Sequence, residues 1–434
     1  MIARRIIGVA LLAIAAAAAQ TIVIRNVTIH PVSGADIPNG AILIENGKIA
    51  DVGARVAAPK GAQVIDAKGL HAYPGMIDSA TEIGLSEIGS IRETNDTNEL
   101  GDFNPQLRAI VAVNPESDHI SVTRANGITS VITLPSSGGG GGRSGSGGVI
   151  AGQAALIRLD GWTWEDLAVR PSAAMQLVFP TIQTTSFRFG GGEGGPSRTP
   201  YAEAKTAYDK KLKELEDFFE SSRRYQRAKA SREPGLKTDL RYEAMLPVLD
   251  GKTPVFMNAI RERTIRDAIQ FADKQKIRIV LAGPRDFGKT LPDIAAHKIP
   301  VIAPPTLELP MEEDDRYDAA ATLPSELYKA GVKFAFGSFN VQFARNLPYQ
   351  AATAVAFGLP YAEALKAVTL NGAEIWGVAN ELGSIEKGKL ADIILTDGDP
   401  LETQTQIKHM FIRGREVDLS NKHTRLYDKY MKRP

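Results

Sequence analysis

The sequence predicts an α/β chain in which a (β/α)8 barrel of the TIM type carries a small, discontinuous β-sandwich built from both termini. Two observations lead to this fold class. Between His71 and Asn380, short apolar runs alternate with segments of helical period, and these roughly 310 residues suit one barrel with insertions. On both sides of that region the pattern changes to short strands and tight turns. The 434 residues are enough for one large barrel and one small domain.

Strand-like segments at the two ends of the chain predict the β-sandwich. The N-terminal stretch TIVIRNVTIHPVSGADIPNGAILIENGKIADVG alternates apolar and polar residues, and its Asn-Gly pairs mark tight turns. Beyond the barrel, GSIEKGKLADIILTDGDPL and QIKHMFIRGREV return to short strands. We expect residues 20–70 and 381–415 to pair into one unit, followed by a C-terminal tail, 416–434.

The region 71–380 carries the pattern expected of the barrel. Its short apolar runs, which we interpret as strands, include ITSVITLP, PVFMNA, RIVLAG, PVIAPP and KFAFGS. Two glycine-rich stretches, 136–148 and 189–197, interrupt the region. The first lacks the Gly-Lys-Ser/Thr of a phosphate loop and leads into the strand-like VIAGQAALIRL. We therefore expect it to be a loop at the barrel mouth rather than a phosphate-binding loop.

A long charged helix is predicted after Pro200. Its apolar and small residues fall on one face, while lysines, glutamates and arginines cover the other. This pattern favours a helix packed on the barrel, with a lid or a partner surface as the alternative. The residues of the packed face are Tyr208, Leu212, Leu215, Phe218, Ser222 and Tyr225.

The first twenty residues, MIARRIIGVALLAIAAAAAQ, have the features of a secretory signal. Arg4 and Arg5 precede an apolar run that is shorter than the ~20 residues of a membrane-spanning helix, and small alanines close the run. We expect residues 1–19 to be a signal peptide and the chain to be exported, to the periplasm or the outside. A membrane anchor is the alternative. The chain has no cysteine, which excludes a lipid-anchored lipoprotein, disulfides and thiolate chemistry.

The net charge gives no reason to expect polyanionic partners. Removal of Arg4 and Arg5 would leave 49 of the 51 basic residues against 50 acidic ones, a formal charge of −1. A nearly neutral chain has no electrostatic attraction to nucleic acid or to an anionic membrane, and no stable membrane insertion is expected.

Two segments carry a resemblance to a known group of proteins. GLHAYPGMID, from Gly69 to Asp78, resembles the entry strand of the amidohydrolase superfamily, and TLNGAEIWGVANELGSIEKGKLADIILTDGDPL resembles the exit of the same fold. ARNLPYQAATAVAFGLPYAEALKAVTLN is similar to the imidazolonepropionase-like branch. The resemblance extends from Ile22 to about Arg415 and is weaker over the glycine-rich stretches and the helix after Pro200. It implies a (β/α)8 barrel, a small β-sandwich from both termini, and a metal site at the carboxyl ends of the strands.

The resemblance also implies a chemistry. Members of the superfamily hydrolyse amide or other C–N bonds with one or two divalent metals, zinc among them, which activate a water and polarise the scissile carbonyl. Imidazoles and carboxylates are the ligands that such metals prefer. The family pattern places His-x-His after the first strand, histidines at strands five and six, and an aspartate after strand eight.

This sequence departs from the family pattern at each ligand position that aligns, and the ligand of the fourth strand does not align. The aligned positions hold Ala80, Glu82, Asn258, Ala282 and Phe339. No two of the six histidines share ligand spacing. We therefore predict no metal ligands and no cofactor. A carboxylate-only Mg²⁺ or Ca²⁺ site in the loop after the first strand is the alternative, built from Glu82, Glu87, Glu93 and Asp96.

Two functions remain open. In the first, the chain hydrolyses a C–N bond with a weaker oxygen-ligand metal or a directly activated water. Glu82 would be the base, Asn258 and Arg261 would polarise the carbonyl, and Ser338 and Asn340 would help to bind the substrate. In the second, the chain is catalytically inactive and binds a small molecule at the barrel mouth, or pairs with an active homologous amidohydrolase. A homo-oligomer is a further option.

Overall fold

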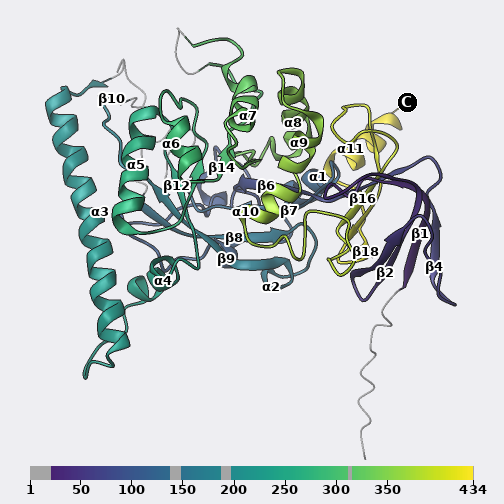
Figure 1. The fold of residues 1–434 in the computed structure, drawn as a ribbon, viewed down its shortest axis with the longest axis horizontal. Coiled ribbons are helices and arrows are strands. Elements are labelled where there is room, and N and C mark those ends of the chain that lie inside the picture. Colours follow the sequence, from purple (N-terminus) through teal and green to yellow (C-terminus); the bar gives the residue numbers. More distant parts are fainter. Residues whose placement is uncertain (1–20, 137–147, 187–196, 311–314, 434) are drawn as a thin grey trace, which may run out of the picture.

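Two eight-stranded sheets organise the chain (Figure 1). The fold is that of a computed structural model, which describes residues 21–136, 148–186, 197–310 and 315–433. The expected signal peptide, 1–19, and most of the two glycine-rich stretches lie outside the described residues. Within the described ranges, no helix is long and apolar enough to cross a membrane.

The first sheet, on the right of Figure 1, joins strands from both ends of the chain. β5 pairs antiparallel with β16, so that Tyr73 lies opposite Ile394. Fully buried aliphatic and aromatic side chains, such as Ile24, Ile42 and Phe411, form its core. Its strands are β1 (Ile22–Ile29), β2 (Ile37–Glu45), β3 (Lys48–Gly53), β4 (Gln63–Asp66), β5 (His71–Pro74), β16 (Ile393–Thr396), β17 (Ile407–Ile412) and β18 (Arg415–Glu416).

The boundary between the two sheets differs slightly from the expected one. Residue 71 was expected to open the barrel, but β5 belongs to the sheet of the two termini, and the first barrel strand begins at Met76. The expected tail, 416–434, contains a helix, α11 (Lys422–Met431). The packing of the terminal strands as a two-layer sandwich stays a prediction.

The second sheet is the barrel. Its strands, in spatial order, are β6 (Met76–Thr81), β7 (Ile128–Thr133), β8 (Ile150–Arg158), β9 (Ala168–Val178), β12 (Val255–Asn258), β13 (Ile279–Ala282), β14 (Val301–Ala303) and β15 (Phe334–Phe336). β8 runs antiparallel to both of its neighbours, while the other adjacent pairs are parallel. The expectation of eight parallel strands is therefore wrong at β8.

The short connection between β8 and β9 explains their relative direction. Two parallel neighbours need a crossover of about a dozen or more residues, usually a helix, to bring the chain back to the same edge. β8 and β9 are joined only by a short turn with a single helical turn, α2 (Trp164–Leu167). A connection this short returns the chain in the opposite direction, so β8 must oppose β9.

Hydrogen bonds between the first and last strands nearly close the barrel. The Phe339 N–H donates to the Ala80 carbonyl at 2.7 Å, and the Ser338 N–H donates to Asp78 Oδ1 at 2.9 Å. Asp78 Oδ1 also accepts from the Ala80 N–H at 3.1 Å, while Oδ2 has no hydrogen-bond partner among the described residues. Burial raises the pKa of the Asp78 carboxyl to about 7. Asp78 therefore fastens the seam between β6 and β15.

Helices connect the later barrel strands in the expected way. Three short 3₁₀ helices and a two-stranded ribbon, β10 (Thr185–Ser186) and β11 (Ser197–Arg198), accompany them. The 3₁₀ helices span Arg92–Thr94, Ala109–Ala112 and Ala344–Asn346. The α-helices are α1 (Asp118–Arg124), α3 (Tyr201–Ala230), α4 (Leu240–Leu249), α5 (Glu262–Gln275), α6 (Leu291–Ala296), α7 (Ala319–Lys329), α8 (Leu347–Ala356), α9 (Tyr361–Ala367) and α10 (Leu370–Ile375).

The predicted helix after Pro200 is α3, the long helix at the far left of Figure 1. Five of the six residues expected on its packed face are buried, and Leu212 is partly buried. The Tyr208 hydroxyl donates to Asp267 of α5 at 2.8 Å, which ties the helix to the barrel. The helix is therefore a packed element, as its pattern predicted.

An aromatic stack fills the barrel along its length. The Phe256 ring of β12, which is fully buried, lies 6.5 Å from the Phe339 ring and nearly parallel to it, and 5.5 Å from the Trp376 ring at 68°. Phe339 follows β15, while Trp376 follows α10. Short aliphatic side chains from the neighbouring strands, such as Ala282 and Ile302, complete this core. The barrel interior is thus packed and apolar below the strand ends.

Candidate functional site

A cavity of about 890 Å³ opens at the carboxyl ends of the barrel strands. Residues at or just after the ends of β6, β7, β9, β12, β13, β14 and β15 line it. Three residues proposed from the sequence, Glu82, Asn258 and Arg261, all line this one cavity, although nearly 180 residues separate the first from the last. The structure thus brings the predicted catalytic residues to one place.

Glu82 is the carboxylate of this cavity. It follows β6 and is partly buried. Burial raises the pKa of its carboxyl above the ordinary value, and a hydrogen bond with Ser136 opposes that rise. Ser136 also lines the cavity. A carboxyl group with a raised pKa can hold or take up a proton nearer to neutral pH than an exposed glutamate can.

Arginines line part of the cavity. Arg261 immediately precedes α5, and Arg263 lies in its first turn. Arg285 forms an ion pair with Glu308, and the Arg263 guanidinium donates to the Tyr201 hydroxyl at 3.0 Å. Arg263 Nε also lies 3.8 Å from Asp267 Oδ2, so carboxylates balance the charge of both Arg263 and Arg285.

Ser338 and Asn340, the candidate binding residues, do not line the cavity. Ser338 is almost fully buried, and its hydroxyl lies 3.1 Å from the Asn340 carbonyl, to which it donates. The Asn340 side-chain oxygen accepts from the backbone N–H groups of Gln342, at 2.7 Å, and Phe343, at 3.1 Å. Both side chains therefore stabilise the turn after β15, and their proposed part in binding has no counterpart in the cavity lining.

Gln176 is a cavity residue that the sequence reasoning missed. It lies on β9 between Gly152 of β8 and Phe256 of β12 in the sheet register. Only 5% of its surface is exposed, and its side-chain Oε1 is buried without a hydrogen-bond partner in the described parts of the chain. The signal was a single polar residue in the apolar run AAMQLV, at a position that faces the barrel interior.

The residues at the family's metal positions do not form a metal site. Ala80 and Ala282 carry no ligand atom, Asn258 is a weak ligand, and the Phe339 ring occupies the end of the last strand. The ring fits closely, since a Cβ at Gly337 would lie 3.0 Å from Phe339 Cε2 and 2.8 Å from the Ala80 methyl. The carboxyl end of β9, the fourth barrel strand, contributes the apolar Val178 and Phe179.

The alternative carboxylate site is not assembled either. No group of three or more His, Cys, Asp or Glu side chains comes together with metal-binding geometry in residues 21–136, 148–186, 197–310 and 315–433. Glu87 instead accepts from the Asn114 side-chain amide at 3.3 Å, in the loop after β6. The described donor set does not fit a divalent metal, and we derive no step through one.

We predict that the purified chain holds well below one zinc per molecule after dialysis. A catalytic zinc takes about three protein ligands plus water, and Glu82 alone cannot replace them. Elemental analysis of wild type and Glu82→Gln should therefore give the same low metal content. Near one zinc, manganese or iron per chain, lost in Glu82→Gln, would contradict this prediction.

The fold defines a class of protein, a TIM-type barrel with a cavity at the carboxyl ends of its strands. A family model described as the amidohydrolase family matches residues 312–417. The amidohydrolase tasK of Hapsidospora irregularis is 27% identical over 430 residues, which cover 89% of this chain and 41% of the relative. The chain thus spans about two fifths of the length of that curated relative.

Solved structures agree with this class. The crystal structure of an amidohydrolase from Thermotoga maritima MSB8 is 27% identical, with a TM-score of 0.77, and the match covers 92% of this chain and 99% of that chain. A molinate hydrolase is 16% identical, with a TM-score of 0.54 and coverages of 92% and 95%, which shows a shared fold. These matches and the family model show that the chain is similar to amidohydrolases in sequence and fold. The imidazolonepropionase-like branch stays a prediction.

Proposed function

We propose that this chain is an exported protein that binds a small molecule with an amide or similar C–N group in the barrel-mouth cavity, without a family-type metal. The observation that carries the proposal is the buried Gln176 side chain, whose Oε1 has no hydrogen-bond partner among the described residues, in a cavity that Asn258 also lines. The signal-like pattern of residues 1–19 supports the exported location.

The cost of the unpaired oxygen argues for a ligand. A buried acceptor without a donor costs about 1–3 kcal/mol, and a ligand N–H or O–H removes that cost on binding. Gln176 and Asn258 each offer both a donor and an acceptor, which matches the two sides of an amide group. Phe256 and Phe339 at the base of the cavity give the ligand an apolar contact.

Replacing Gln176 by methionine should weaken the binding of such a ligand by about tenfold or more, because an isosteric apolar side chain cannot accept its hydrogen bond. Calorimetric titration with a panel of small lactams and N-acyl amino acids measures the effect. The unliganded variant should be at least as stable as wild type, since the unpaired oxygen is gone.

Gln153→Met is the matched control. The Gln153 amide lies on β8 outside the cavity and donates to the Pro105 carbonyl at 2.8 Å. This variant should lose stability and keep its ligand affinity. If Gln176→Met binds every positive member of the panel as tightly as wild type does, Gln176 does not contact the ligand and the proposal loses its main support.

Hydrolysis of the bound C–N group is the second candidate, and the raised pKa of Glu82 favours it. Glu82 would take a proton from a water as the water oxygen attacks the carbonyl carbon, and would return that proton to the amine nitrogen as the C–N bond breaks. Asn258 and Arg261 would stabilise the carbonyl oxygen. Product formation by wild type in the presence of a chelator, lost in Glu82→Gln while binding persists, would support hydrolysis. Binding with no product would leave the first candidate.

A further inference from the structure

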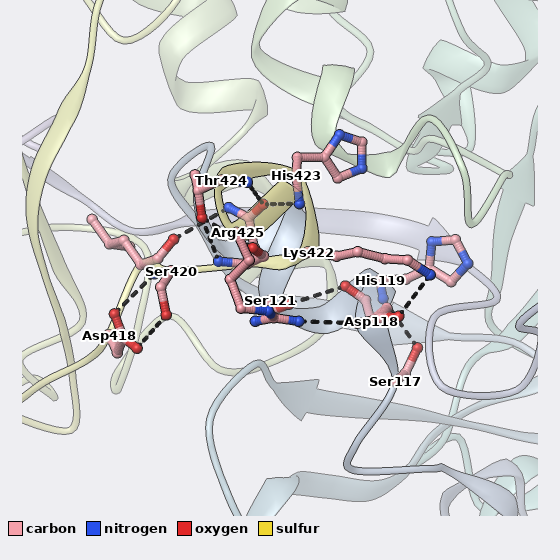
Figure 2. Close-up of polar contacts among 12 residues, drawn as sticks. Ser117, Asp118, His119, Ser121, Asp418, Ser420, Lys422, His423, Thr424 and Arg425 are labelled. Carbon is pink, nitrogen blue, oxygen red and sulfur yellow. Dashed lines mark hydrogen bonds and ion pairs between the residues drawn. The ribbon is translucent and has the colours of Figure 1, made fainter. Parts of the chain in front are cut away.

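The C-terminal helix α11 lies on the surface with no buried residue. Its start is fixed, because the Asn421 side chain accepts from the backbone N–H groups of His423, at 2.9 Å, and Thr424, at 3.3 Å (Figure 2). The Thr424 hydroxyl in turn accepts from the Asn421 N–H at 2.9 Å, which completes a capping box. The helix is thus well defined, although hydrophobic packing does not hold it in place.

Ion pairs attach one side of α11 to the rest of the protein. Lys422 Nζ lies 3.1 Å from Asp118 Oδ2, and the Arg425 guanidinium lies 3.7 Å from Asp118 Oδ1. Asp118 is the first residue of α1, and Figure 2 shows both basic side chains reaching toward it. The side of α11 that carries Lys422 and Arg425 therefore faces the protein.

The apolar residues of α11 are exposed. They follow one another at spacings of one, three and one, so that they share a single face of the helix. At about 100° per residue, this face lies on the side roughly opposite to the one that carries Lys422 and Arg425. The residues and their exposed fractions are Leu426 40%, Tyr427 64%, Tyr430 48% and Met431 66%.

Basic side chains border this apolar face. Lys429 Nζ lies 5.9 Å from the centre of the Tyr430 ring, and the Arg433 guanidinium lies 4.6 Å from it. Lys432 lies between them in the sequence. None of the three forms an ion pair with a carboxylate in the described portion of the chain, whereas Lys422 and Arg425 do. The exposed surface of the segment therefore carries apolar side chains and, beside the Tyr430 ring, basic groups that no carboxylate of the described residues pairs.

We propose that α11 docks on a bilayer surface that contains anionic lipid. An amphipathic helix of this kind lies in the interface, with its apolar side chains among the acyl chains and its lysines and arginines near the headgroups. Each basic side chain near an anionic surface contributes about 1 kcal/mol to binding. The nearly neutral charge of the whole chain hides this basic segment, because acidic residues elsewhere offset it.

Charge also favours an anionic bilayer over a second copy of the chain as the partner of this face. A symmetric pair formed through this face would place the same surface on both sides. Lys429 and Arg433, which lie beside the Tyr430 ring, would then approach their counterparts, and like charges at close range oppose association. An anionic bilayer offers the complementary charge and an apolar interior.

Hydrogen exchange of the full chain tests the proposal at the helix itself. With vesicles of phosphatidylcholine and about one third phosphatidylglycerol, the amides of residues 426–431 should exchange about tenfold more slowly, as expected for docking that several basic groups support. Vesicles of phosphatidylcholine alone should leave the exchange unchanged. Because the readout is local to α11, binding of the N-terminal apolar segment to the same vesicles does not affect it.

Two variants and a control decide the result. The Lys429→Glu/Arg433→Glu variant should lose the protection, and so should Tyr427→Ser/Met431→Ser, which keeps the charge. Lys210→Glu/Lys213→Glu on α3 makes the same change in net charge at exposed positions and should keep it. Absence of protection in wild type, equal protection on neutral vesicles, or protection retained in the first two variants would overturn the proposal. Protection that grows with protein concentration without vesicles would assign the face to a second copy instead.

Discussion

Replacing Phe256 by alanine is expected to lower the free energy of unfolding by about 4 kcal/mol, since Phe→Ala in a packed core removes both the transfer free energy of the ring and its contacts. Phe256 is fully buried and is the middle ring of the stack between Phe339 and Trp376. The void would join the cavity above it, so its walls cannot easily collapse. Urea unfolding at neutral pH measures the loss.

Phe256→Leu is the control for this prediction. Leucine keeps most of the volume, and a swap of this kind usually costs less than about 1.5 kcal/mol. A loss below about 1 kcal/mol in Phe256→Ala would mean that the ring is loosely packed. The apolar filling of the barrel would then have to come from other side chains.

The stability of the chain is expected to fall as the pH rises from about 4 to 7, through the two buried aspartates. Burial raises the folded-state pKa of Asp78 to about 7 and that of Asp392 to about 6, against 3.8 for an exposed aspartate. Below the unfolded-state pKa, both aspartates are protonated in the folded and in the unfolded chain, so their ionisation does not change the free energy of unfolding. As the pH rises toward the folded-state pKa, the unfolded chain releases protons that the folded chain retains, and folding becomes less favourable.

Asp78→Asn isolates the larger of these two effects. Asparagine keeps an oxygen that accepts from the Ser338 and Ala80 N–H groups, and it cannot ionise. As the pH rises, the variant should therefore become more stable relative to wild type. The shift should approach about 4 kcal/mol at most between pH 4 and pH 8, because each pKa unit is worth about 1.4 kcal/mol. Urea unfolding at several pH values gives the curve. A difference that does not change with pH would show that Asp78 is ionised throughout, and Asp392→Asn provides the parallel case.

Much of the barrel could be predicted from the sequence because its strands are short apolar runs between helical segments. Each of the five runs interpreted as a strand became one: β7, β12, β13, β14 and β15. β9 was missed because Pro171 and Arg170 interrupt its pattern. The structure accommodates the proline where the pairing of β8 with β9 shifts register, between Leu156↔Arg170 and Ala154↔Ala174. The direction of β8 could not be predicted either, since a strand buried along its whole length has a similar pattern in either direction.

Some residues of the candidate site could be predicted from the sequence and others could not. Glu82 and Asn258 could be placed because a family pattern fixes their positions relative to strand ends, and both line the cavity. Gln176 could not be, because its importance depends on the sheet register that turns it inward and on the lack of a nearby donor. Ser338 was predicted to help bind the substrate, but its N–H closes the barrel and its hydroxyl stabilises a turn. Hydrogen bonds that close a barrel or stabilise a turn in this way can be identified only from the structure.

The position of the barrel seam also bears on the order in which the fold forms. β7, β8 and β9 are antiparallel neighbours joined by connections of modest length, so their pairing closes small loops at little entropic cost. The contact between Asp78 and Ser338 spans 260 residues and must wait for the strands between them. We therefore expect the β7–β9 meander to be an early nucleus and the seam to be the last contact made. A contact that forms after the transition state mainly changes the unfolding rate and has little effect on the folding rate. We therefore expect the hydrogen bonds of Asp78 to slow the unfolding of the barrel.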